Sequence, residues 1–165
     1  MSESLIISLD SQVDSLEIVG GKGRSLAKLT NAGFDVPGGF QITTQAYRQF
    51  VAEHNLQSQI LELAKPRIVE GTSSFEQASR DIVSLFHEHA LNEEITQQIV
   101  KAYEALEGTP AVAVRSSANA EDLPDLSFAG QQETYLNVTG ANEVAAAVRN
   151  CWASLWTAQA INYRH

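Results

Sequence analysis

Residues 20–47 read GGKGRSLAKLTNAGFDVPGGFQITTQAY, and they predict a helix that begins directly after a pair of glycines. From Lys22 to Ala32 the apolar side chains recur on one helical face, as in an amphipathic helix. Gly33 follows at the position where a glycine commonly ends a helix. Lys22 is therefore expected at a helix N-terminus.

The second part of this stretch predicts a turn, a short strand and another helix. Residues 36–39 contain a proline and two glycines, which favour a turn, and residues 40–42 then alternate in polarity as a strand does. Thr43 or Thr44 offers an N-cap for a helix over residues 45–54.

On either side of this stretch, the chain combines few strands with several helices. A short aliphatic run over residues 5–9 predicts a first strand. Residues 55–108 have helical periodicity and are interpreted as a helical insertion or cap. Helices within it are expected at about residues 57–69, 74–89 and 93–106.

The C-terminal third predicts two more strands and a long helix. Residues 111–114 and 133–138 are β runs with a polar loop between them, and residues 141–160 have the spacing of an amphipathic helix. Together these elements predict an α+β fold with a small mixed or antiparallel sheet. They are expected to form a single domain over residues 1–165.

Composition and charge exclude several functional classes. With 165 residues, 44% of them hydrophobic, the chain can bury one core. Its net charge of −9 disfavours binding to nucleic acid or to an anionic membrane surface. The single cysteine, Cys151, and the lack of a signal peptide or a membrane-length apolar run predict a soluble, cytoplasmic protein. Any anion site must be a local exception to the acidic surface.

The first candidate for such a site is the glycine-rich turn around Lys22. The start of a helix presents backbone N–H groups and the positive end of the helix dipole to an anion, and a lysine adds a mobile charge. A P-loop is absent, because Leu16 and Gly23 occupy the places where that motif needs a glycine and a Ser or Thr. The alternative interpretation is an ordinary turn with a solvated lysine.

Two further candidates lie in the C-terminal third. Arg115 follows directly on a predicted strand, and its planar guanidinium suits a phosphate; the alternative is a structural ion pair with Glu121 or Asp122. The small-residue loop that leads to Thr134 could bring its backbone close to phosphates. Its alternative is a plain β-hairpin loop.

Three blocks of sequence, taken together, identify a family resemblance. They are residues 20–47, the segment AVAVRSSANAEDLPDLSFAGQQETYLNV over 111–138, and CWASLWTAQAINYR over 151–164. The chain resembles the N-terminal nucleotide-binding domain shared by phosphoenolpyruvate synthase, pyruvate phosphate dikinase and rifampicin phosphotransferase, which has an ATP-grasp-like fold. The resemblance starts at about residue 17 and is weakest through residues 55–108.

The resemblance implies a role for each candidate residue. Lys22 and Arg115 would contact the triphosphate of ATP, and the loop residues Gly130, Gln131 and Gln132 with Thr134 would cover the phosphates. This domain would pass a phosphoryl group to a histidine on a separate domain, which delivers it to pyruvate.

The resemblance also implies missing parts. The adenine pocket and the ligands of Mg²⁺ are expected in a second half of the nucleotide-binding domain, so no metal ligand is assigned to this chain. We therefore expect a fragment of a longer enzyme that is inactive alone. The fragment is expected to self-associate if the apolar face around Trp152 and Trp156 is left uncovered.

Alternative functions remain at this stage. The acceptor could be an antibiotic, as in rifampicin phosphotransferase, or phosphate, as in pyruvate phosphate dikinase. A different class is a non-catalytic, nucleotide-binding regulatory module.

Other patterns favour structural roles. His87 and His89 stand two residues apart on a predicted helix and so point to different faces, which disfavours a shared metal. Trp152, Trp156 and Cys151 are expected to pack in the interior.

Overall fold

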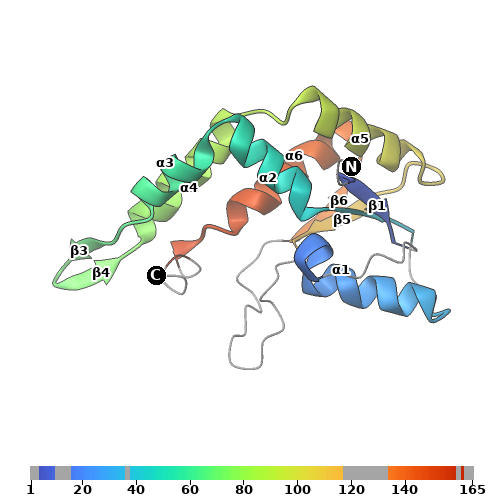
Figure 1. Ribbon diagram of the computed structural model, residues 1–165, viewed down its shortest axis with the longest axis horizontal. Coiled ribbons are helices and arrows are strands. Elements are labelled where there is room, and N and C mark those ends of the chain that lie inside the picture. The colour runs from blue at the N-terminus through green and yellow to red at the C-terminus, as the bar shows by residue number, and fades with distance from the viewer. Residues whose placement is uncertain (1–3, 10–15, 36–37, 117–133, 159–160, 162–165) are drawn as a thin grey trace.

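The computed structural model describes residues 4–9, 16–35, 38–116, 134–158 and 161. Within these ranges it contains six helices and three two-stranded antiparallel sheets (Figure 1). The helices are α1 (Leu16–Asn31), α2 (Thr44–Glu53), α3 (Leu56–Leu63), α4 (Glu76–Glu88), α5 (Glu93–Glu104) and α6 (Ala141–Ser154). The strands are β1 (Ile6–Ser8), β2 (Phe40–Ile42), β3 (Arg67–Val69), β4 (Thr72–Ser74), β5 (Val112–Arg115) and β6 (Thr134–Val138). The predicted α+β class is confirmed.

The hydrophobic core is built mainly by α2 to α6. In α5 the buried residues Ile95, Ile99 and Tyr103 recur every fourth position, so they form one stripe along the helix. The other helices contribute in the same way, and α6 packs against both α4 and α5. The largest fully buried side chains besides those of α5 are Phe50, Leu56, Ile60, Ile82 and Phe86. Burial of each such side chain contributes about 1.5–3 kcal/mol to folding.

An aromatic group at the centre of this core joins α2, α4 and α6. Trp152 lies edge-on to Tyr47, with ring centroids 5.7 Å apart, and 5.5 Å from the ring of Phe50. The indole Nε1 of Trp156 donates a hydrogen bond to the Tyr47 hydroxyl at 3.2 Å. Both tryptophans pack against the core, as predicted, and both are partly buried.

Cys151 is buried on α6, as predicted, with its Sγ 3.6 Å from the backbone oxygen of Val114. This contact ties α6 to β5. The helix itself is shorter than expected: it ends at Ser154, after which Leu155 and Trp156 form tighter turns through bonds to Trp152 O and Ala153 O.

The first sheet has two differently occupied faces. β1 pairs with β2 with Ile6 opposite Ile42 and Ile7 opposite Gln41. Side chains alternate across a strand, so Phe40 and Ile42 pack on the core while Gln41 turns to the opposite face, against α1. This sheet therefore lies between the core and α1.

Thr43 occupies the predicted N-cap position of α2, but it does not cap the helix with its side chain. Its hydroxyl instead donates to the backbone oxygen of Ser4 at 2.8 Å. The buried hydroxyl thereby fixes the chain segment that enters β1. Because it donates to Ser4 O, it makes no capping bond to α2.

The C-terminal end of α1 has the predicted glycine stop. Gly33 adopts a φ of 87°, its N–H donates to Thr30 O, and the N–H of Phe34 reaches back to Leu29 O. This pair of bonds is a Schellman motif, and it satisfies carbonyls that a helix end leaves without partners.

The helix expected over 57–69 is wrong in its second half, and the one expected over 74–89 starts slightly too early. α3 ends at Leu63, and residues 67–74 form a hairpin of β3 and β4 instead. Pro66 cannot continue a helix, and the two loop residues Glu70 and Gly71 both have positive φ, as a type I′ hairpin turn requires. The hairpin projects from one end of the molecule (Figure 1).

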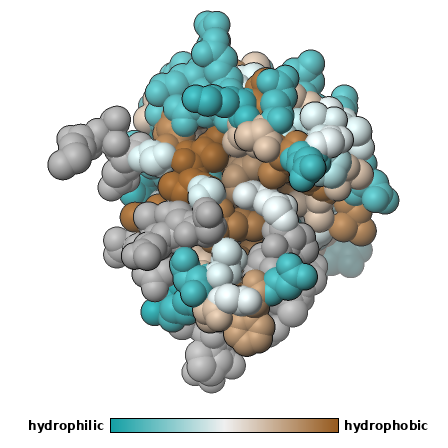
Figure 2. All heavy atoms as spheres, turned by 90° about the vertical axis from the view of Figure 1, so that its right-hand side faces the viewer, coloured by the Kyte–Doolittle hydropathy of each residue, from teal (hydrophilic) through white to brown (hydrophobic). Residues whose placement is uncertain are grey.

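The opposite end of the molecule, where α1 and α5 end, is shown face-on in Figure 2. Apolar side chains gather at the centre of this face, and polar side chains gather at its upper rim. None of the helices in the described ranges is both long enough and apolar enough to cross a membrane. The turn predicted over residues 36–39 falls partly outside those ranges.

Candidate functional site

The glycine-rich turn breaks α1 into two segments. Gly20 has φ 71° and ψ 178°, a conformation essentially restricted to glycine, so the helix that carries Lys22 begins directly after it. Lys22 therefore lies in the first turn of a helix, as predicted. In that position the positive end of the helix dipole and the lysine charge reinforce each other.

The turn is packed closely. Gly21 and Gly23 are buried and Lys22 is half-buried. A methyl group added at Gly23 would collide with Oε1 of Gln41 and would lie 2.9 Å from Cβ of Val19. Gly23 is thus required by the close approach of its neighbours. One of these neighbours, Gln41, belongs to β2, so β2 packs directly against the turn next to Lys22.

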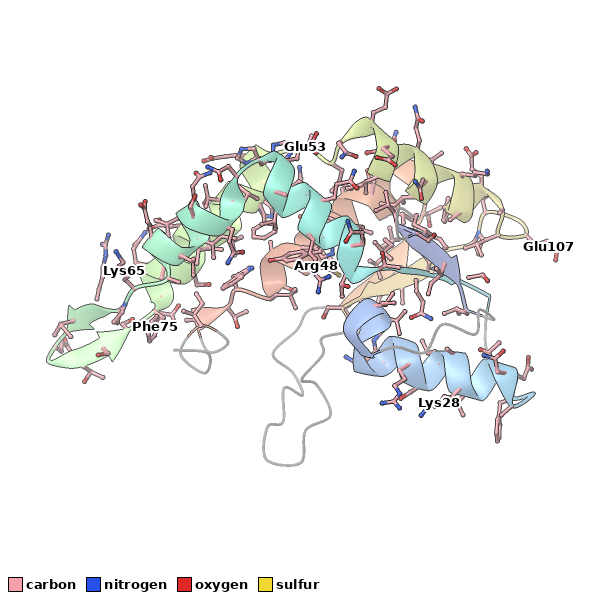
Figure 3. The ribbon with its side chains drawn as sticks, viewed as in Figure 1. Lys28, Arg48, Glu53, Lys65, Phe75 and Glu107 are labelled. Atoms are coloured by element: carbon pink, nitrogen blue, oxygen red, sulfur yellow. The ribbon has the colours of Figure 1, made fainter. Side chains whose placement is uncertain are left out.

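The charge of α1 differs from that of the whole chain. It carries Lys22, Arg24 and Lys28 against a single acidic residue, Glu17, whereas the chain has a net charge of −9. Arg24 and Lys28 are exposed, and Figure 3 shows Lys28 directed away from the body of the molecule. The locally basic helix is the exception that an anion site in an acidic protein requires.

Arg115 and Thr134 are brought together by the sheet of β5 and β6. They face each other across the two strands, and both are exposed. Directly opposite residues of an antiparallel pair project to the same face, so the guanidinium and the hydroxyl can address one ligand. Lys22 is contributed by a different element, α1, which packs on β2 and α2.

Part of the expected site falls outside the described residues. This holds for the loop residues Gly130, Gln131 and Gln132, and also for Glu121 and Asp122, which the alternative interpretation pairs with Arg115. Their predicted roles stay predictions.

A groove of about 520 Å³ runs between β6 and α6, and Thr134 lines it. The other lining residues are Tyr135, Leu136, Asn137, Val138, Thr139, Glu143, Ala146, Ala147 and Asn150. Glu143 is the one charged side chain in this lining, so the groove by itself offers no counter-charge to a phosphate.

The described residues do not fit a metal site. Within them, no group of three or more His, Cys, Asp or Glu side chains is close enough to hold a metal ion. His89 uses its Nδ1 in a 2.8 Å hydrogen bond with the backbone oxygen of Leu85.

Sequence reasoning missed one residue beside the turn, which is Gln41. Its side chain is 8% exposed, and neither its Oε1 nor its Nε2 has a hydrogen-bond partner within the described structure. A buried amide without partners costs about 1–3 kcal/mol. The only signal in the sequence is one polar residue in the middle of a three-residue strand, which is too short for a periodicity to stand out.

The comparison with known families decides the identity of the fold family. Residues 16–165 match the family described as pyruvate phosphate dikinase, AMP/ATP-binding domain. The chain belongs to this family. The match includes α1 with Lys22 and the sheet that carries Arg115 and Thr134.

Three similar curated relatives are named phosphoenolpyruvate synthase or probable phosphoenolpyruvate synthase. The chain is 46% identical to the phosphoenolpyruvate synthase of Aeropyrum pernix, over 99% of the chain and 21% of that protein. It is 45% identical to the probable phosphoenolpyruvate synthase of Methanocaldococcus jannaschii, over 90% of the chain and 13% of that protein. It is 42% identical to the probable phosphoenolpyruvate synthase of Methanothermobacter thermautotrophicus, over 92% of the chain and 23% of that protein. The chain thus spans less than a quarter of the length of these relatives.

Proposed function

We propose that the chain is the ATP-phosphate-binding part of a phosphoenolpyruvate synthase-type dikinase. The observation that carries this proposal is the position of Lys22 in the first turn of a helix that begins at the Gly20 kink, in a locally basic segment of an acidic protein. The family match and the names of the relatives support it.

In the proposed reaction, ATP, pyruvate and water give AMP, phosphoenolpyruvate and phosphate by way of a histidine on another domain. Phosphoryl transfer asks the protein mainly for positioning and for neutralisation of charge along the phosphates. Lys22 and Arg115 would supply that charge, and Thr134 would add a hydroxyl donor beside Arg115. Gly130, Gln131 and Gln132 would close over the phosphates.

The remaining parts of the site are proposed to lie elsewhere. Because the chain spans 13–23% of its relatives, a second half of the nucleotide-binding domain and a phosphohistidine domain would be its partners. Mg²⁺, which neutralises phosphate charge when bound, would be held by that second half. We further propose that residues 1–165 form one domain with residues 55–108 as an insertion or cap, in the cytoplasm, and that the chain has no catalytic activity alone.

A second candidate keeps the site and changes the acceptor. The family description names pyruvate phosphate dikinase, in which phosphate would take the place of water. The relatives named phosphoenolpyruvate synthase favour water as acceptor, and they do not favour an antibiotic. Both candidates require the same ATP contacts.

Calorimetric titration of Mg·ATP into the 165-residue chain tests the proposal. We expect weak, saturable binding that Lys22→Ala and Arg115→Ala each reduce about tenfold or more, because each removes a charge-assisted contact worth about 1.5–3 kcal/mol.

Two matched controls sharpen this test. Lys28→Ala removes an exposed lysine from the same helix. Arg67→Ala removes an exposed arginine that lies opposite Ser74 in a hairpin, as Arg115 lies opposite Thr134. Binding that is absent, or equally weakened by the controls, would contradict the proposal.

A further inference from the structure

Gln41 is the buried polar group that the proposed site does not explain. It sits at the centre of β2, opposite Ile7, with apolar neighbours in the strand on both sides. Both atoms of its amide are fully enclosed without a hydrogen bond in the described part of the chain. A leucine would fill such a position without leaving polar atoms unpaired, so the glutamine needs a reason.

The location of the amide supplies that reason. Its Oε1 occupies the space where a Cβ of Gly23 would be, so the amide lies directly under the first turn of the helix that carries Lys22. It cannot touch a ligand itself, because its amide atoms are covered. It can act only through the turn that lies against it at Gly23.

We propose that Gln41 is a positioning residue for the Lys22 turn, held without hydrogen bonds until an ATP phosphate engages that turn. This inference rests on the proposed function. A glutamine amide offers one acceptor and two donors, so it can bond both N–H and carbonyl groups of a turn that shifts slightly over it. The hydrogen bonds missing in the free chain form in the complex and favour the ATP-bound position of Lys22.

The first test replaces the amide with an apolar side chain of similar size. Gln41→Leu should raise the melting temperature of the free chain by a few degrees, because a buried unpaired amide is removed. The same variant should weaken Mg·ATP binding about tenfold in calorimetry. Gln97→Leu makes the same chemical change at an exposed position on α5 and should leave the affinity for Mg·ATP unchanged.

A second pair of variants covers the case in which Gln41→Leu does not fold. Gly23→Ala alone should lose both stability and affinity, since its methyl group meets Gln41 Oε1. In the double variant Gly23→Ala with Gln41→Ala, the shortened side chain removes the collision with Oε1, and the 2.9 Å approach to Cβ of Val19 remains. Stability should then return in part, while the affinity for Mg·ATP stays low.

Nuclear magnetic resonance of the side-chain amide gives a readout that a purely structural role would not move. The Gln41 NH₂ signals, assigned by their loss in Gln41→Leu, should shift downfield and exchange more slowly with water when Mg·ATP is added. Unchanged signals, or a Gln41→Leu variant that binds Mg·ATP as tightly as the wild type, would overturn the inference and leave the proposed function intact. Failure of the wild-type chain to bind Mg·ATP would instead overturn the proposed function.

Discussion

Gly20 shows how a single residue sets the geometry of the candidate site. Its φ of 71° with ψ of 178° ends the first segment of α1 and starts the second one at the turn that carries Lys22. Any side chain at this position would strain the backbone by about 1–3 kcal/mol. The requirement for glycine here comes from the backbone, whereas at Gly23 it comes from contact with Gln41.

Gly20→Ala is therefore expected to destabilise the chain by about 1–3 kcal/mol and to weaken Mg·ATP binding. Urea denaturation and calorimetry measure the two effects. Gly38→Ala is the matched control, since Gly38 has open space around it and no positive φ. Equal stability of the two variants would argue against the kink as the reason for glycine.

Tyr103 is a second residue whose removal has a defined consequence. Its ring is buried, and its hydroxyl donates to Pro110 O at 2.9 Å and accepts from the N–H of Gly140 at 3.0 Å. These bonds connect α5 with the segments that enter β5 and α6. The hydroxyl thus fixes the strand that presents Arg115 relative to the core.

Tyr103→Phe is expected to lower the free energy of unfolding by about 1–3 kcal/mol, because it removes two part-buried hydrogen bonds worth about 0.5–1.5 kcal/mol each. Urea denaturation of the variant and the wild type gives the difference. A change below about 0.5 kcal/mol would mean that water replaces the hydroxyl.

At the scale of elements, the sequence predicted the helix whose apolar residues recur regularly over several turns, and it missed a hairpin that has no such pattern. The helix expected over 93–106 is present as α5, Glu93–Glu104. It could be predicted because three apolar residues, each four positions after the last, mark its buried face. The hairpin of β3 and β4 was missed, because Ile68 and Val69 extend an apolar pattern past Pro66, up to the end of the helix expected over 57–69. Pro66 and Gly71 were the residues that indicated the end of the helix and the turn of the hairpin.

The candidate site divides in the same way. The glycine pair predicted the place of Lys22 in the first turn of a helix, and the strand pattern predicted the place of Arg115 at a strand end. Their contacts with ATP were implied by the family resemblance and stay predictions. Gln41 could not be, because its environment is created by the packing of α1 on β2, which no local pattern records.

The hairpin offers a prediction at this scale. Gly71 has a φ of 79° in the two-residue turn, so Gly71→Ala should loosen β3 and β4. Both strands are almost entirely exposed and project from the body, so global stability and Mg·ATP affinity should change little. Hydrogen exchange that speeds up beyond residues 67–74 would show that the hairpin supports the core.

At the scale of the whole molecule, the strand β6 is a candidate surface for self-association. Within the described structure it pairs with β5 on one side only, and Leu136 on it is 69% exposed. A strand edge that carries an exposed leucine is a template for a further strand. The tryptophans, in contrast, are packed against the core.

Self-association through β6 should appear in sedimentation velocity as a mass that rises with protein concentration. Leu136→Ser is expected to reduce it, while Leu29→Ser, which changes a less exposed leucine on α1, should not. A single mass at all concentrations would contradict the expectation.

The central claim, that this chain holds the phosphates of ATP, is tested most directly by phosphorus nuclear magnetic resonance of Mg·ATP mixed with the 165-residue chain. We predict that the phosphate signals shift and broaden with the wild type and with Lys28→Ala, and that at the same concentrations they move most of the way back to their free positions with Lys22→Ala and with Arg115→Ala. Phosphate signals that are unaffected by the wild-type chain, or equally affected by all four proteins, would contradict the account.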